Sequence, residues 1–292
     1  MSFSHNRAES YKKYEFKKFC HNVGFEQVQI AALLDNISGN YKQWSEKKID
    51  KAGKVKTYKD GTEKERHFKV PSTLLKAVQS RIKTNILSKI KLPKVVHGGV
   101  KKRSNITNAK QHQGKKYIFC TDLQEFFPNV NSKKVYDALI NLNFSSHFAH
   151  CLTELTTFKE EVPQGAPTSS HICNLVFLQT DIKLINLCKL NKISYTRYVD
   201  DLTFSSQKDF AQLIGEIISI IIAAGFKVSH RKTKYSADQI VTGIAVFLHK
   251  IDGPEKLIQK SIVEIETNAD KKYNTIYLNS IRKTNKKKNR VK

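Results

Sequence analysis

The sequence of 292 residues lacks any long uninterrupted run of apolar residues. Its longest apolar stretch, residues 213–224, is broken by Gly215, Glu216 and Ser219. It falls short of the roughly 18 apolar residues that a membrane-spanning helix needs. The N-terminal residues also lack the apolar core of a secretory signal. We therefore expect neither a membrane helix nor secretion.

Cysteine is scarce as well. The five cysteines are odd in number and widely spaced, with no Cys-x-x-Cys pair, which excludes a disulfide framework. His147, His150 and Cys151 have no fourth ligand at a suitable spacing, so a zinc site is not expected. This pattern predicts reduced, buried thiols in a cytoplasmic protein.

Acidic residues are few beside the basic ones. The chain has 26 Asp and Glu against 51 Lys and Arg, a net charge of +25. Residues 41–103 hold 19 basic and 5 acidic residues, residues 251–292 hold 11 and 5, and residues 117–250 hold 13 and 12. The hydrophobic content of 39% suits a folded protein. A near-neutral body flanked by basic segments indicates nucleic acid as the partner, and no membrane.

Hydrophobic periodicity predicts a mixture of helices and strands. Helical spacing marks residues 10–23, 27–34, 74–90, 131–142, 168–190 and 210–224, and strand-like runs occupy 117–121, 192–198, 202–206, 227–229 and 240–249. Residues 45–69 are polar and rich in lysine, and predict a hairpin or loop. This order predicts an α+β fold, a sheet with helices packed on one face.

Three aspartates stand out against the predicted strands. Asp122 ends an apolar strand, where an unpaired charge is costly. Asp200 and Asp201 are adjacent between two strand-like runs. Carboxylates that converge from separate strands suit Mg²⁺, which prefers oxygen ligands. Alternatively, the Asp-Asp pair merely marks a polar turn.

Three ordered motifs resemble those of reverse transcriptases. They are residues 122–128 for the first catalytic aspartate, residues 162–169 for the Gln-Gly motif, and Tyr198-Val199-Asp200-Asp201 for the signature hairpin. Residues 108–112 and 241–243 resemble the NAxxH and VTG elements of bacterial retron reverse transcriptases. The resemblance covers roughly residues 70–250.

The resemblance implies a right-hand polymerase fold with fingers, a palm built on an antiparallel sheet, and a short helical thumb. Residues 1–64 would form an N-terminal helical and basic extension, 65–250 the fingers and palm, and 251–292 the thumb and basic tail. Three aspartates and one backbone carbonyl would hold two Mg²⁺ ions, with Mn²⁺ as an alternative. The metal-binding residues implied are Asp122, Leu123, Asp200 and Asp201.

The resemblance also assigns residues to the incoming nucleotide. They are Phe127, Gln164, Gly165, Arg103 and Lys232. Phe127 stands where the family has a ring that excludes a ribose 2′-hydroxyl, and we expect one of Phe126 and Phe127 to be core. Lys115 or Lys116 is the alternative to Arg103 as the triphosphate ligand. Lys232 either protonates the leaving pyrophosphate or simply faces a phosphate.

RNA binding is predicted at two places. Asn108 and His112 would share one face of a helix, although a structural role for the histidine stays open. The C-terminal tail would lie along the duplex backbone through its lysines. The tail residues named for this role are Lys286, Lys287 and Lys288.

As to function, the resemblance implies copying of a structured non-coding RNA into single-stranded DNA, primed from an RNA hydroxyl. The substrates would be dNTPs, the product an RNA–DNA hybrid, and a further partner an effector protein from the same operon in anti-phage defence. One alternative is a group II intron-like or other defence-associated reverse transcriptase. Another is a non-catalytic RNA-binding scaffold.

Overall fold

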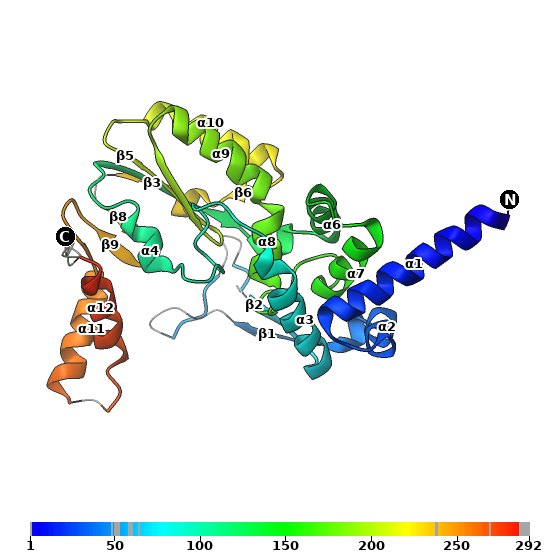
Figure 1. Cartoon of the computed structure of the whole chain (residues 1–292). Coiled ribbons are helices and arrows are strands. Elements are labelled where there is room, and N and C mark those ends of the chain that lie inside the picture. The colour runs from blue at the N-terminus through cyan, green and yellow to red at the C-terminus, as the bar shows by residue number, and fades with distance from the viewer. Residues whose placement is uncertain are drawn as a thin grey trace, which may run out of the picture. The chain divides into compact units, whose positions relative to one another are not determined.

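The structure, a computed structural model, describes residues 2–47, 49, 53–57, 61–63, 65–236, 239–268 and 270–285 (Figure 1). The chain forms two compact units, Met1–Lys91 with Glu125–Phe177, and Leu92–Gln124 with Leu178–Lys292. This division by compactness does not follow the predicted segments 1–64, 65–250 and 251–292, which stay a prediction. Within the described ranges, no helix has the length and apolar character needed to cross a bilayer.

The first unit is mostly helical and carries one two-stranded ribbon. Its elements are α1 (Ser2–Val23), α2 (Gln27–Asp35), η1 (Ser38–Asn40), β1 (Tyr41–Lys47), β2 (Glu65–Pro71), α3 (Thr73–Asn85), η2 (Leu87–Lys89), α5 (Phe126–Asn129), α6 (Ser132–Asn141), α7 (Ser146–Thr156) and α8 (Ser169–Val176). β1 and β2 pair antiparallel along their whole length. Within residues 45–69, predicted as a hairpin or loop, residues 45–47 and 65–69 therefore form paired strands.

Local sequence explains where the helices of this unit begin. The Ser72 hydroxyl accepts a hydrogen bond from the Leu75 N–H at 3.3 Å and caps α3. Asn131 caps α6 in the same way, accepting from the Lys134 N–H at 2.9 Å. The long helix predicted for residues 168–190 is wrong in one respect, because the chain breaks at Phe177 into α8 and α9.

The second unit is built around a five-stranded antiparallel sheet. Its elements are α4 (Asn105–Lys110), β3 (Tyr117–Gln124), α9 (Leu178–Leu190), β4 (Ser194–Tyr198), β5 (Asp201–Ser206), η3 (Ala211–Leu213), α10 (Ile214–Ala223), β6 (Lys227–Val228), η4 (His230–Lys232), β7 (Lys234–Ser236), β8 (Gln239–Val241), β9 (Ile244–Val246), β10 (Ile251–Asp252), α11 (Glu255–Glu266) and α12 (Tyr273–Lys283). β3 is central: β5 pairs with one edge, and β7 and β6 pair with the other. α9 and α10 lie side by side and pack against β4 and β6 (Figure 1).

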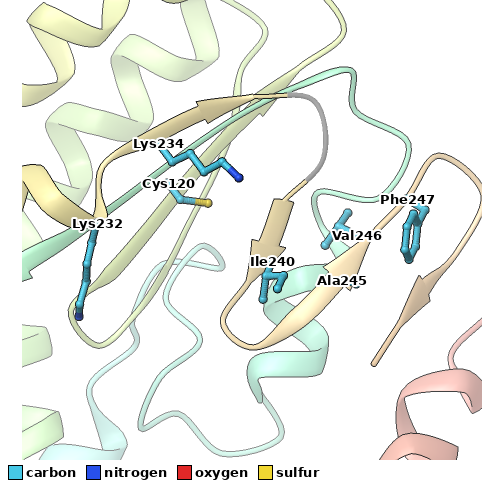
Figure 2. Close-up of a pocket in the computed structure, with 7 residues that line it drawn as sticks. All are labelled: Cys120, Lys232, Lys234, Ile240, Ala245, Val246 and Phe247. Atoms are coloured by element: carbon cyan, nitrogen blue, oxygen red, sulfur yellow. The ribbon is translucent and has the colours of Figure 1, made fainter. Parts of the chain in front are cut away.

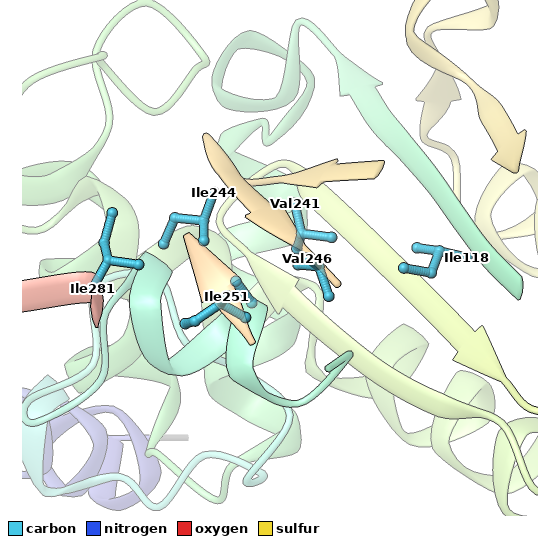
Figure 3. Packing of buried hydrophobic residues seen from close by; sticks show 7 residues of the cluster. Ile118, Val241, Ile244, Val246, Ile251 and Ile281 are labelled. Carbon is cyan, nitrogen blue, oxygen red and sulfur yellow. The ribbon is translucent and has the colours of Figure 1, made fainter. Parts of the chain in front are cut away.

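A smaller sheet of the second unit shares a core with β3. Strands β10, β9 and β8 pair antiparallel in that order. Their apolar side chains pack with those of α4, β3 and α12 (Figure 3), and the buried members are Ala109, Ile118, Val241, Ile244, Val246, Ile251 and Ile281. The single strand predicted for residues 240–249 is wrong. The chain turns at Thr242 and Gly243, whose φ angles of 46° and 80° suit a two-residue hairpin turn.

The mixed α+β character predicted from the sequence is confirmed by these elements. All five cysteines are free, and all except the half-buried Cys120 are buried. This agrees with the prediction of reduced, buried thiols.

Candidate active site

Two of the three aspartates lie at the same level of the large sheet. Asp122 near the end of β3 and Asp201 at the start of β5 are Cα partners in the antiparallel pairing. Directly opposed residues have their side chains on the same face of a sheet. Asp200 precedes β5, and its carbonyl accepts a hydrogen bond from the Leu123 N–H at 3.0 Å. The three aspartates therefore gather at one end of the β3–β5 pair.

The turn that carries Asp200 has an unusual backbone. Val199 has a φ of 58°, which is rare for a β-branched residue and costs of order 1–3 kcal/mol. Gly98 packs directly against this turn, because a Cβ added there would lie 2.5 Å from both the backbone N and the Cγ2 of Val199. Only glycine fits at position 98 without displacing the turn.

Arg197, which precedes Tyr198-Val199-Asp200-Asp201 in the chain, contacts the Val199 turn from the buried side. Its Nη1 donates to the Val199 carbonyl at 2.9 Å. Its Nε and Nη2 donate to the two carboxylate oxygens of Asp181 in α9, at 2.9 and 2.6 Å. Both side chains are fully buried, and the Tyr195 hydroxyl donates to Asp181 at 2.7 Å. A bidentate pair of this kind fixes orientation as well as charge, so the turn is anchored to α9.

The aspartates repel one another electrostatically. Burial, followed by the charges of Asp200 and Asp122, raises the pKa of Asp201 to about 7. Burial and then the Asp122 charge also raise the pKa of Asp200. The Lys232 ammonium lies 2.7 Å from Asp122 Oδ2. Although burial opposes it, this hydrogen bond raises the pKa of Lys232. The site concentrates negative charge that a cation would relieve.

The donor chemistry of this cluster fits a divalent cation. Three carboxylates supply hard oxygen ligands, and two of them have raised pKa values that a bound cation would lower. As they stand, however, no three His, Cys, Asp or Glu side chains of the described ranges are grouped to hold one ion. The ammonium of Lys232 is the cation beside Asp122 in this arrangement.

The raised pKa of Asp201 predicts a pH-dependent gain in stability on its replacement. In EDTA, we expect Asp201→Asn to unfold a few degrees above wild type at about pH 8, with a clearly smaller difference at about pH 5. The folded-state pKa of about 7 lies above that of an unfolded aspartate, so wild-type stability falls as the pH rises from about 4 to about 7. Below that window the carboxyl is protonated in both states. Thermal unfolding followed by circular dichroism measures the difference.

Addition of Mg²⁺ at about pH 8 is the matched control for this prediction. A cation bound by the carboxylates relieves the repulsion, so we expect it to stabilise wild type more than Asp201→Asn. Equal unfolding temperatures for the two proteins in EDTA at about pH 8 would contradict the electrostatic account.

The residues predicted to bind the nucleotide divide between the two units. In the first unit, the ring of Phe126 is buried, with its centroid 5.9 Å from that of Phe177. The ring of Phe127 is partly exposed. Gln164 and Gly165 are exposed in the segment before α8, and Gly165 has a φ of 99°. Their roles at a nucleotide stay predictions.

Arg103 of the second unit has a local role that the sequence did not predict. Its Nη1 donates to the carbonyls of Pro93 and Val96, at 2.6 and 2.5 Å. The side chain therefore closes the loop before α4, which leaves less of the guanidinium for a triphosphate. Of the predicted alternatives, Lys116 lies over the ring of Tyr117, 5.4 Å from its centroid.

Asn108 and His112 require a correction, because both are fully buried. The two ring nitrogens of His112 lie 2.7 Å from the hydroxyls of Ser205 and Thr196. Burial, with smaller effects of nearby cations, lowers the pKa of His112 to about 3, so the ring is neutral. The Asn108 amide donates to the Thr242 hydroxyl at 3.3 Å. These side chains tie α4 to the sheets and expose no surface to RNA.

The other predicted RNA contacts, Lys286, Lys287 and Lys288, lie outside the described residues. The VTG element, residues 241–243, by contrast lies within the described residues. Its Thr242 carbonyl accepts a hydrogen bond from the Asn105 amide at 3.2 Å, and the same amide donates to the Tyr277 hydroxyl at 2.5 Å. Asn105 of α4 therefore joins the element to α12 within the second unit.

A hollow of about 390 Å³ lies in the same unit (Figure 2). Its walls are mostly apolar, with two lysines, and the lining residues are Cys120, Lys232, Lys234, Ile240, Ala245, Val246 and Phe247. Lys232 belongs to both the hollow and the carboxylate cluster.

Comparison with known proteins gives consistent matches. The sequence profile of the family described as "Reverse transcriptase (RNA-dependent DNA polymerase)" matches residues 49–265. The Retron Se72 reverse transcriptase of Salmonella heidelberg is 36% identical over 190 residues, covering 65% of this chain and 47% of that protein. The Retron Ec86 reverse transcriptase of Escherichia coli is 33% identical over 205 residues, covering 68% and 64%.

One solved structure is more distant. A telomerase from Candida albicans, in complex with a fragment of telomeric RNA, matches 62% of this chain and 37% of its own, at 12% identity and a TM-score of 0.44. Among the curated relatives named above, the matched region spans 47% to 64% of the relative's length.

Proposed function

This chain belongs to the reverse transcriptase family, with retron reverse transcriptases among its relatives, and we propose that it is an RNA-directed DNA polymerase of the retron type. The observation that carries the proposal is the pairing of Asp122 with Asp201 across two strands, with Asp200 beside them. Acids held this close at the cost of mutual repulsion are expected where a cation is to be bound.

In this proposal Asp122, Asp200, Asp201 and the Leu123 carbonyl hold two Mg²⁺ ions, or Mn²⁺ in their place. Such ions activate a priming hydroxyl and stabilise the charge of a leaving pyrophosphate. The protein's own part is positioning, because phosphoryl transfer depends mainly on alignment and charge. Lys232 carries its positive charge beside Asp122, where it could serve the leaving phosphates.

The right-hand division belongs to the same proposal. Fingers would comprise about residues 65–116 and 131–160, the palm the aspartate strands, and the thumb the chain after about residue 250. Phe127 would exclude a ribose 2′-hydroxyl. Gln164 and Gly165 would pack against the nucleotide and the template base.

The template would be a structured non-coding RNA that also supplies the priming hydroxyl. The product would be single-stranded DNA joined to that RNA by a 2′–5′ branch. An effector protein from the same operon would be the partner in anti-phage defence, in the cytoplasm. These assignments rest on sequence similarity to retron reverse transcriptases.

The deciding experiment measures dNTP incorporation with co-purified RNA, comparing wild type with the Asp200→Asn/Asp201→Asn double variant. We expect wild type to incorporate dNTPs and the double variant to lose roughly 10³-fold or more, since the metal site supplies several kcal/mol to the barrier. If neither protein incorporates nucleotides with the cognate RNA present, the polymerase proposal fails and the non-catalytic scaffold is favoured.

Sequencing the bound nucleic acid distinguishes a retron enzyme from the other kinds of reverse transcriptase considered above. A small RNA covalently joined to single-stranded DNA supports it. Intron-derived RNA, or unlinked DNA, would instead favour a group II intron-like or other defence-associated reverse transcriptase.

A further inference from the structure

The β1–β2 ribbon of the first unit packs one face against its own unit at the end that holds Tyr41 and Lys69. Side chains alternate between the two faces of a strand, so Tyr41 and Lys69 share a face. Tyr41 is buried, with its ring 4.4 Å from that of Phe158. Lys69 pairs with Glu161 and lies over the Phe158 ring. This is the inner face.

The opposite, outer face of the ribbon carries exposed apolar side chains beside charged ones. Trp44 and Phe68 are Cα partners, and their rings stack with centroids 5.2 Å apart and planes 15° apart. Trp44 is nevertheless 46% exposed, and the neighbouring Val70 is 39% exposed. The indole Nε1 donates to Glu46 at 3.3 Å, which restricts the ring's rotation. The pair therefore presents a fixed aromatic plane to solvent.

The charge around this plane selects its occupant. Lys42 is exposed on the same face, and residues 41–103 carry 19 basic against 5 acidic residues. A second copy of the chain would bring an equally basic segment and be repelled. Unpaired nucleic-acid bases stack on aromatic side chains, while nearby lysines neutralise their phosphates. Glu46 on the same face is occupied by the indole N–H. An exposed indole with Lys42 on its face, in a strongly basic segment, has the chemistry of such a stacking platform.

We propose that the outer face of the β1–β2 ribbon binds single-stranded RNA, with an unpaired base stacked on Trp44 and phosphates neutralised by Lys42. The inference rests on the proposed function for RNA as the partner. It adds a contact surface outside the aspartate cluster, on the first unit of the chain.

The protein reports on this surface directly, because Trp44 is its single tryptophan. Titration with short oligo(rA) should quench the intrinsic fluorescence of wild type and reduce its accessibility to acrylamide. A blunt RNA duplex of the same length should bind with much less quenching, since its bases are already stacked. Quenching equal to that of the single strand would overturn the claim of an unpaired base.

Four variants separate stacking from folding and charge. Binding by the variants is followed through the anisotropy of a labelled oligo(rA), because those at position 44 lack the tryptophan. We expect Trp44→Ala and Trp44→Leu to weaken binding roughly 10- to 100-fold, and Trp44→Phe to retain most of the affinity. Lys42→Ala should instead lower the log–log salt slope by about 0.7, which the Trp44 variants should leave unchanged. Val28→Ala, which trims another exposed side chain of the unit, is the matched control and should bind as wild type does.

Two results would overturn the proposal outright. One is salt-dependent oligo(rA) binding that leaves Trp44 fluorescence unchanged. The other is fluorescence that changes with protein concentration in the absence of RNA, which would make the face a contact between copies. Incorporation of dNTPs, measured on the same samples, keeps the outcomes distinct: an inactive protein that still shows quenching loses the polymerase proposal and keeps the RNA surface.

Discussion

Adding one methyl group at Gly98 is expected to reduce dNTP incorporation by roughly 10²-fold or more while the protein remains folded. The Cβ of Gly98→Ala would lie 2.5 Å from the backbone N of Val199, and backbone cannot rotate away as a flexible side chain can. The turn must shift, and Asp200 shifts with it. A displacement of about 1 Å at a reacting centre can lower the reaction rate by roughly 10²-fold.

Gly215→Ala is the matched control for this experiment. It adds the same methyl group to the same unit, within α10, where a Cβ meets nothing within 4 Å. Its activity and unfolding temperature should equal or slightly exceed those of wild type, since alanine favours a helix. Full activity in Gly98→Ala, with normal circular dichroism, would show that the tight packing at Val199 does not position Asp200.

A second large effect, on stability, is expected from the buried ion pair of Asp181 and Arg197 next to the Val199 turn. Asp181→Leu leaves the Arg197 guanidinium buried without its carboxylate, which should lower the free energy of unfolding by about 3–5 kcal/mol. Urea denaturation measures this loss. Both partners are fully buried, so solvent cannot compensate for the lost charge.

A double variant separates stability from positioning at this pair. Replacing both partners, Asp181→Leu with Arg197→Met, removes the uncompensated charge and should restore much of the stability. Activity should nevertheless be low, because the double variant removes the donor that Arg197 provides to the Val199 carbonyl at 2.9 Å. If the double variant regains both stability and activity, the pair serves folding alone.

The aspartate strands could be predicted because their signal is local. Residues 117–121 form an apolar run that ends at Asp122, and a strand bordered by a charge at its end is readable without tertiary information. The starts of α3 and α6 were equally local, set by the side chains of Ser72 and Asn131.

The anchor behind the turn could not be predicted in this way. Arg197 and Asp181 lie 16 residues apart on a strand and a helix, and only tertiary packing brings them together. A signal was present nonetheless, since each is a charged residue in a largely apolar segment. Buried charges are rarely left unpaired.

The NAxxH element shows a different limit. A spacing of four places Asn108 and His112 on one face of a helix, but periodicity does not say whether that face meets solvent or the core. In the structure α4 ends at Lys110, before His112. Both side chains point inward, to hydroxyl groups of β4, β5 and the turn at Thr242. The division of the strand predicted for residues 240–249 into the short strands β8 and β9 was missed because three residues are too few for a period to appear.

The central place of β3 restricts how this chain can change in length. Between Tyr117 and Gln124 the strand pairs on both edges, with β5 on one and β7 and β6 on the other. An insertion or deletion of one residue before Asp122 would move its carboxylate to the opposite face of the sheet and mismatch three neighbours at once. Tolerated insertions and deletions should therefore fall outside β3, so the distance along the chain from Tyr117 to Asp122 is as constrained as the aspartate itself.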